Sequence, residues 1–354
     1  MRFAFICYEH QKLHFLEPHA KVLELKGHKV KFHLLDTKKP GTLKSRRGVL
    51  DLPSQLISLM LFLNKEKFDC LISITPKAGF VTVIVNSIYS VRHIHWFTGQ
   101  VWCNDSGFRR FFRSLPDRFI NKFAHQILAD SRPQRNYLLE HGFNAEKILV
   151  CANGSISGVD PTIKPRIRTR EVNSKIKIGV VGRLCKDKGL NTILDLIEAN
   201  GFDEKNFEFH FFGDFDDGED DLRARFESTA RAFPSVLFLK GSVLDKTIIY
   251  KDINLVLSAS FREGFSNTLI EAQYSGIPVI VRNIYANYDA FVPDRTGFFF
   301  DHIDDLISSL EEFQDNHLYQ NFSSNAITYV EDHFLRSTVL KCITEVYEAN
   351  CHIP

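Results

Sequence analysis

The chain has 354 residues, of which 44% are hydrophobic and 25% charged, and its formal net charge is +1. This length exceeds what one hydrophobic core usually serves, so we expect two domains, and the composition excludes the disordered and collagen-like classes. The opening residues lack a signal-peptide core, and no stretch approaches the roughly 20 apolar residues of a membrane span, so a soluble, cytoplasmic protein is expected.

The first part of the chain alternates strand-like runs with helical patterns. Short β-branched or aromatic runs are typical of buried strands, and the segments between them have helical periodicity. This rhythm predicts a doubly wound parallel sheet in an N-terminal Rossmann-like domain, residues 1–160. The expected strands are 2–8, 28–35, 69–74, 92–97, 125–130 and 147–152, and the expected helices are 16–26, 52–63 and 78–89.

Residues 161–175 have two prolines, many charges and no apolar period, which indicates a linker. The same rhythm then restarts and predicts a second Rossmann-like domain over 176–333, so that two parallel sheets face a cleft. From residue 301 the pattern is helical, and the last helix, 334–354, is expected to pack back toward the N-terminal domain. The expected strands of the second domain are 175–181, 207–212, 236–241, 253–258 and 277–282, with helices at 190–200 and 221–233.

The segment after the strand 253–258 combines a glycine-containing loop with a helix that opens near Asn267. Ser266 and Asn267 are good N-cap residues, and the free N–H groups of the first helical turn attract a phosphate. Glu263 precedes this helix, and Glu271 lies one turn inside it, on the same face as Asn267. Carboxylates accept hydrogen bonds from vicinal hydroxyls, which suits a sugar or a ribose, although a lone Glu is often only a capping or solvated residue.

A second cluster follows the strand 175–181. The strand ends at Gly182 and Arg183, and a short loop brings Lys188 and Gly189 before the next helix. Ligands of open α/β sheets bind at this edge, where an Arg and a Lys are placed to neutralise a diphosphate. Gly-Arg turns are common in α/β proteins, so this pattern is weak by itself.

Together these residues resemble glycosyltransferase family 4, whose members are retaining GT-B enzymes that use nucleotide sugars. The spacing Glu263-GFSNTLI-Glu271 matches the family's pair of glutamates, and Gly182-Arg183 with Lys188-Gly189 matches its phosphate loop. The resemblance covers the chain from about residue 128 onward and implies a metal-independent transfer of a hexose or N-acetylhexosamine from a nucleotide-diphosphate sugar, a UDP-sugar first among the donors. No permanently bound cofactor is implied.

The resemblance also implies roles for individual residues. Glu271 would hold the ribose, Glu263 the donor hexose, and Arg183 and Lys188 the diphosphate. The backbone of Phe265, Ser266, Asn267 and Thr268 would cradle phosphate and sugar, and Gly241, Ser242 and Val243 would adjoin the nucleobase.

The N-terminal half matches the family less well. It has Tyr8, Glu9 and His10 where many members have a Gly-Gly pair. The segment around His95 resembles that of bacterial capsule and O-antigen transferases, which implies that His95 lines the donor sugar. The alternative is a histidine whose hydrogen bonds are satisfied at the end of a strand.

No metal site is expected. The acidic run Gly213–Asp221 includes Asp214 and Asp216, but it lacks EF-hand spacing and is typical of a solvated loop. The seven cysteines are scattered without a Cys-x-x-Cys pair, as in a reducing cytosol. Two rival functions share this architecture: a nucleotide-sugar 2-epimerase, whose Asp-Ser-Gly-Gly-x-x-Glu-Glu run is missing from the sequence, and a non-catalytic nucleotide-sugar-binding scaffold.

The two halves of the chain differ in charge. Residues 1–170 contain 27 Lys and Arg against 13 Asp and Glu, whereas the remainder has 17 against 30. The bases are concentrated in the runs 38–47 and 109–118, and the second run interleaves them with Phe108, Phe111, Phe112 and Leu115. We therefore expect peripheral docking on an anionic cytoplasmic membrane face, with a polyprenyl-diphosphate-linked or oligosaccharide acceptor and no nucleic-acid partner. The alternative is a solvated helix face with Phe111 and Leu115 in the core.

Overall fold

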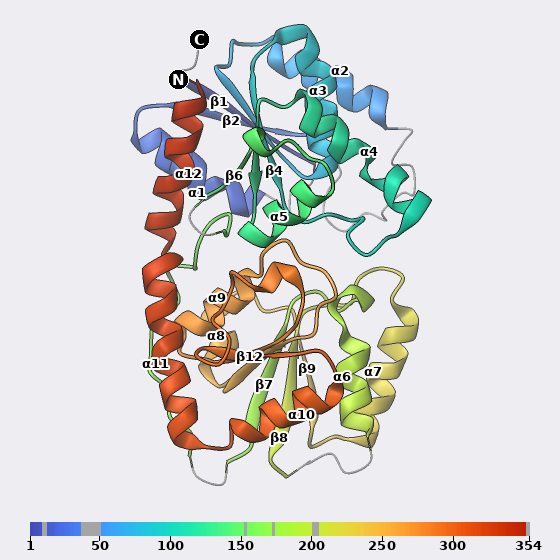
Figure 1. Cartoon of the computed structure of the whole chain (residues 1–354), viewed down its shortest axis with the longest axis vertical. Coiled ribbons are helices and arrows are strands. Elements are labelled where there is room, and N and C mark those ends of the chain that lie inside the picture. Colours follow the sequence, from blue (N-terminus) through green and yellow to red (C-terminus); the bar gives the residue numbers. More distant parts are fainter. Residues whose placement is uncertain (9–12, 37–50, 152–153, 172–173, 200–204, 352–354) are drawn as a thin grey trace. The chain divides into compact units, whose positions relative to one another are not determined.

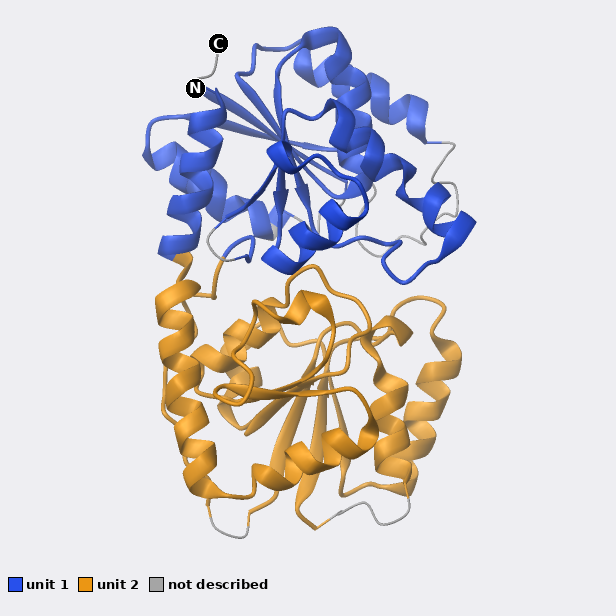
Figure 2. Ribbon diagram, in the orientation of Figure 1, with its two compact units in different colours: residues 1–157, 337–354 blue, residues 158–336 orange. Residues whose placement is uncertain are grey.

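A computed structural model of the chain describes residues 1–8, 13–36, 51–151, 154–171, 174–199 and 205–351. They form two compact units, each built around a six-stranded parallel sheet (Figures 1 and 2). The first unit contains Met1–Ser157 and Ser337–Pro354, and the second contains Gly158–Arg336. The predicted fold class, α/β with two doubly wound Rossmann-like domains, is confirmed.

The sheet of the first unit has the strand order β2-β1-β3-β4-β5-β6. The side chains of β1 alternate between its faces, so Phe3 and Phe5 enter one core layer while Ala4 and Ile6 enter the other. Burial on both faces explains why the inner strands β1 and β3 are nearly continuous apolar runs, whereas the edge strand β2 is only partly buried. The strands are β1 (Arg2–Cys7), β2 (Lys29–Leu34), β3 (Cys70–Ile74), β4 (Arg92–Phe97), β5 (Gln126–Ala129) and β6 (Ile148–Val150).

Helices cover both faces of this sheet. α1 (Leu13–Leu25) and α12 (Arg336–Cys351) pack on the layer that contains Phe3 and Phe5, to which α12 contributes Val339, Ile343 and Tyr347. The other face is covered by α2 (Leu52–Leu63), α3 (Pro76–Tyr89), α4 (Gly107–Phe123) and α5 (Arg132–Glu140), with the 3₁₀ helix η2 (Ala145–Lys147) before β6.

The sheet of the second unit has the order β12-β11-β10-β7-β8-β9. β7 therefore lies beside β10, and the chain proceeds in opposite directions across the sheet on the two sides of this pair. Ligands of doubly wound sheets bind at the carboxyl ends of such a pair. The strands are β7 (Ile176–Val181), β8 (Phe207–Phe212), β9 (Leu237–Gly241), β10 (Leu255–Ser258), β11 (Val279–Arg282) and β12 (Gly297–Phe300).

Two hydrophobic layers enclose this second sheet. α6 (Leu190–Glu198), α7 (Asp220–Ala232) and α10 (Ile303–Glu312) pack on one face, and α8 (Lys246–Lys251) and α9 (Asn267–Tyr274) pack on the other. α11 (Asn316–His333) contributes side chains to both layers. Two 3₁₀ helices, η3 (Lys186–Lys188) and η4 (Tyr285–Asn287), lie in the loops after β7 and β11.

The segment expected as a linker, 161–175, is anchored to the second unit over its described residues. The guanidinium of Arg168 donates to the carbonyls of Tyr250, Lys251 and Ser275 at 2.6, 2.8 and 3.0 Å. Burial lowers the pKa of Arg168, and the three carbonyls accept from three of its five N–H donors. Residues 172–173 lie outside the described part of the chain.

Several elements were not anticipated, and three of them are short or polar. β12 is an edge strand of four residues with no alternation of polar and apolar side chains, so it carries no strand period. α5 is polar and has Pro133 at its start, and α8 is only six residues long. Such short or polar elements are stabilised by packing against their neighbours more than by their own sequence.

Candidate active site

The loop after β7 lies against the end of β10. Gly182 follows the strand with φ +139°, and its N–H donates to the carbonyl of Phe212 on β8 at 2.9 Å. Gly189 closes η3 in the left-handed conformation, φ +65°, where a Cβ atom would lie 1.9 Å from the carbonyl oxygen of Ala259. Glycine is therefore required at this close approach, which brings Lys188 beside the end of β10.

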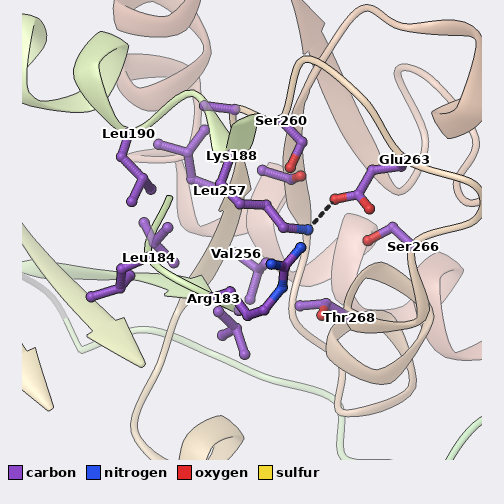
Figure 3. Close-up of a pocket in the computed structure, with 15 residues that line it drawn as sticks. Arg183, Leu184, Lys188, Leu190, Val256, Leu257, Ser260, Glu263, Ser266 and Thr268 are labelled. Atoms are coloured by element: carbon purple, nitrogen blue, oxygen red, sulfur yellow. Dashed lines mark hydrogen bonds and ion pairs between the residues drawn. The ribbon is translucent and has the colours of Figure 1, made fainter. Parts of the chain in front are cut away.

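A pocket lies at the carboxyl ends of β7 and β10, the edge at which doubly wound sheets bind their ligands. Residues 180–184 and Lys188 line it from the β7 side, and residues 256–260 with Glu263 line it from the β10 side. Ser266 and Thr268 close it at the start of α9, which begins at Asn267 as predicted (Figure 3). Ser266 occupies the N-cap position without a side-chain cap hydrogen bond.

Two of the expected residues meet inside this pocket. The ammonium of Lys188 donates to Oε1 of Glu263 at 2.5 Å, although 75 positions separate them in the sequence. Both side chains are mostly buried, 25% and 16% exposed, and Arg183 extends its guanidinium into the same space (Figure 3). The pocket therefore offers two cations and one carboxylate to a ligand.

Arg183 has an ion-pair partner that the sequence did not indicate. Its Nη1 donates to Oδ2 of Asp216, a member of the acidic run. Asp216 is thus part of the pocket's surroundings rather than a solvated loop residue. Among the described residues, no group of three or more His, Cys, Asp and Glu side chains is arranged to hold a metal ion.

Glu271 lies in a different environment from Glu263. It is 4% exposed, and its carboxylate accepts from Nζ of Lys246 and from the hydroxyl of Tyr250, the latter at 3.2 Å. Burial raises the pKa of Glu271, and the neighbouring Lys246 opposes this rise. Glu271 is not among the residues that line the pocket. Lys246 and Tyr250 could have been suspected only from their spacing of four on α8.

The three residues expected near a nucleobase follow β9. Gly241 ends the strand, and its carbonyl accepts from the N–H of Gly213 at 2.9 Å. Ser242 is exposed, and Val243 packs against the hydrophobic layer under α8 and α9. They lie at the same edge of the sheet as the pocket but are not part of its lining.

His95 lies in the interior of the first unit. It occupies the middle of β4, is 0% exposed, and its Nδ1 is 2.8 Å from the hydroxyl of Ser73. A Cβ on Gly79 of α3 would lie 2.4 Å from its ring, so the helix packs directly on it. Burial lowers its pKa and keeps the ring neutral. The ring is closed off from solvent in this structure, so its expected contact with the donor sugar stays a prediction. Glu9 and His10 lie outside the described residues.

This fold and site define a two-domain α/β protein with a pocket that holds two cationic side chains at the switch point of its second sheet. Residues 164–329 match the family described as "Glycosyl transferases group 1", and residues 14–154 match the "Glycosyl transferase 4-like domain". The chain therefore belongs to the group 1, family 4-like glycosyltransferases with the GT-B fold, as the resemblance implied.

Relatives and solved structures agree with this assignment. The capsular polysaccharide biosynthesis glycosyltransferase CapM of Staphylococcus aureus is 27% identical over 318 residues, which cover 84% of this chain and 80% of CapM. Anabaena HepE in complex with UDP superimposes with a TM-score of 0.76 at 16% identity, covering 99% of this chain and all of HepE. Sucrose-phosphate synthase from Thermosynechococcus elongatus has a TM-score of 0.83 at 15% identity, with 99% and 98% covered. At these identities the two structures show the shared fold.

Proposed function

We propose that the protein transfers a hexose or N-acetylhexosamine from a UDP-sugar to a lipid-linked or oligosaccharide acceptor, in the synthesis of a bacterial surface polysaccharide such as a capsule. The observation that carries the proposal is the pair of cations, Arg183 and Lys188, at the switch point beside the start of α9. The similarity to CapM, which is named as a capsular polysaccharide biosynthesis glycosyltransferase, supports a role in capsule synthesis. The complexes of HepE with UDP and with UDP-glucose support a UDP-sugar as the donor.

In this proposal the pocket holds the leaving group of the reaction. Arg183, Lys188 and the N–H groups at the start of α9 stabilise the negative charge that develops on the diphosphate. The backbone of residues 265–268 cradles the phosphate and sugar, and residues 241–243 adjoin the uracil. Glu263 accepts hydrogen bonds from the donor hexose, and Glu271 accepts them from the ribose.

The transfer is proposed to retain the anomeric configuration by attack on the front face. The acceptor hydroxyl approaches C1 on the side that the diphosphate leaves, and a phosphate oxygen takes the hydroxyl proton as the new C–O bond forms. Glu263 is ion-paired with Lys188, which reduces its nucleophilicity and leaves it free to accept from sugar hydroxyls. The two cations supply the charge stabilisation that a divalent metal gives in other transferases, so the reaction is proposed to be metal-independent.

A panel of nucleotide sugars tests the proposal. The protein is incubated with UDP-, GDP- and ADP-sugars, with and without excess EDTA, and the slow release of nucleoside diphosphate is measured. We expect release from one UDP-sugar, its persistence in EDTA, and its loss in Arg183→Gln. Nuclear magnetic resonance of the released sugar reports its initial anomeric configuration. An isomerised UDP-sugar would indicate the 2-epimerase instead, and binding without any release would indicate the scaffold.

We also propose that α4 docks on an anionic membrane surface from which the lipid-linked acceptor is taken. Four apolar side chains in its first half are exposed: Phe108 at 79%, Phe111 at 53%, Phe112 at 50% and Leu115 at 41%. Phe111 and Leu115 are therefore not core residues, so that part of the alternative is wrong, whereas its other part, a solvated helix face, is equally consistent with this exposure. The helix bears five basic residues, and exposed aromatics among bases are typical of helices that enter the headgroup layer. The other basic run, 38–47, lies outside the described residues.

None of the helices in the described ranges is both long and apolar enough to cross a bilayer.

A further inference from the structure

The acidic run after β8 is joined to the phosphate loop through the backbone. A Cβ on Gly213, whose φ is +148°, would lie 1.9 Å from the carbonyl oxygen of Gly182, so the two loops touch. The N–H of Leu184 donates to the carbonyl of Asp214 at 2.8 Å, and the N–H of Asp216 donates back to Leu184 at 3.2 Å. The position of Asp216 beside the phosphate loop is therefore fixed by main-chain contacts.

The pocket balances its own charge. Arg183 is paired with Asp216, and Lys188 is paired with Glu263, so two cations face two carboxylates of the same chain. The guanidinium of Arg183 is 64% exposed, and Asp216 is 28% exposed, so both are open to a ligand. A diphosphate that enters must share Arg183 with Asp216 and also approaches the Asp216 charge.

We propose that Asp216 is a built-in counter-ion that competes with the diphosphate for Arg183, weakens the binding of the nucleoside diphosphate product and so favours its release. The inference rests on the proposed function, which places the diphosphate at Arg183. A guanidinium has five N–H donors, so Arg183 can turn from one partner to the other without leaving the pocket. The charges of Arg183, Lys188, Glu263 and Asp216 sum to zero, and neutralising Asp216 changes this sum to +1.

The test is the variant Asp216→Asn, titrated with UDP by calorimetry beside the native protein. Asp216→Asn removes one negative charge next to the proposed diphosphate site, so the Kd for UDP should fall by about three- to tenfold. This gain in affinity should shrink as salt is added. If Asp216 only held the loop in place, its replacement by Asn would raise the Kd for UDP. Asp216→Glu, which keeps the charge, should bind UDP as the native protein does.

Two controls separate the proposed competition from a general effect of charge. Asp217→Asn removes the same charge from the neighbouring exposed position and should leave the Kd for UDP nearly unchanged. In an Arg183→Gln background, Asp216→Asn should lose most of its gain, because there is no guanidinium left to compete for.

Three results would overturn the inference. An unchanged or raised Kd in Asp216→Asn would do so while the proposed function stands, and so would a full gain that persists without Arg183. If the native protein binds no nucleoside diphosphate at all, the proposed function fails and the inference fails with it.

Discussion

Glu263 and Glu271 lie in one sequence motif but in different surroundings, and this difference separates their expected effects. Glu263 lines the pocket beside Lys188, whereas Glu271 is buried against Lys246 and Tyr250. Glu271→Ala should weaken UDP binding by roughly 1.5–3 kcal/mol, or about 10- to 150-fold. It removes the carboxylate that is proposed to accept hydrogen bonds from the ribose hydroxyls. Glu263→Ala should instead lower turnover and leave UDP binding nearly normal. Calorimetric titration of both variants with UDP measures the difference, and equal losses would refute it.

The raised pKa of Glu271 predicts a pH dependence that Lys246 controls. Ribose hydroxyls donate best to an ionised carboxylate, so affinity should fall as the pH falls through this pKa. Lys246 opposes the rise in the pKa, so in Lys246→Met the pKa of Glu271 should rise further and the loss of affinity should move to higher pH.

Uridine is the probe for this test, since it has no phosphate that titrates in the same range. Its Kd is measured from acidic to neutral pH for the native protein, for Lys246→Met and for the control Lys251→Met on the same helix. Identical pH profiles in the native protein and Lys246→Met would show that the ion pair with Glu271 has no role in ribose binding.

At the scale of single elements, the phosphate loop depends on Gly189. Gly189→Ala would place a methyl group 1.9 Å from the carbonyl of Ala259 as well as requiring a left-handed alanine. We expect a loss of about 2–4 kcal/mol in the free energy of unfolding, together with weaker UDP binding because Lys188 is displaced.

A matched control for this loop is Gly218→Ala. Gly218 also has a positive φ, +83°, but no atom lies within 4 Å of a Cβ there. Gly218→Ala should lower the free energy of unfolding by only about 1 kcal/mol, the cost of placing alanine in a left-handed conformation. Urea unfolding of both variants makes the comparison, and equal losses would mean that the close approach to Ala259 relaxes without cost.

Much of the fold could be predicted from the sequence because its strands are buried on both faces and appear as continuous apolar runs. The start of α9 at Asn267 was also predictable from its capping residues. Two ion pairs could not be predicted from the sequence: Lys188 with Glu263, and Arg183 with Asp216. Sheet topology brings each pair together across at least 33 positions. β12 was not predicted because this four-residue edge strand shows no alternation of polar and apolar residues.

For the whole molecule, the asymmetry of charge leads to a prediction about vesicles. The protein should sediment with anionic liposomes but not with neutral ones, and binding should fall steeply between low and physiological salt. Phe108 and Phe112 pack together at a ring-centroid distance of 4.4 Å on the exposed face of α4. The double variant Phe108→Ser with Phe112→Ser should therefore reduce binding.

Leu25→Ser is the matched control, since Leu25 is 80% exposed at the end of α1, on the opposite face of the sheet. Arg109→Gln should weaken binding about fivefold, which corresponds to the roughly 1 kcal/mol that a basic residue contributes near such a surface. Equal partitioning to neutral and anionic vesicles, or no effect of salt, would show that the basic charge serves another purpose.

The first unit is discontinuous in sequence, because α12 completes a hydrophobic layer that β1 begins. During synthesis the ribosome delivers this helix only after the entire second unit. Until then Phe3 and Phe5 lack the cover that Val339, Ile343 and Tyr347 provide, so the unit that is translated first cannot finish folding until α12 has left the exit tunnel. A nascent chain stalled after residue 157 would consequently expose apolar surface to chaperones, whereas the second unit, contained within residues 158–336, has all of its own segments once these have emerged.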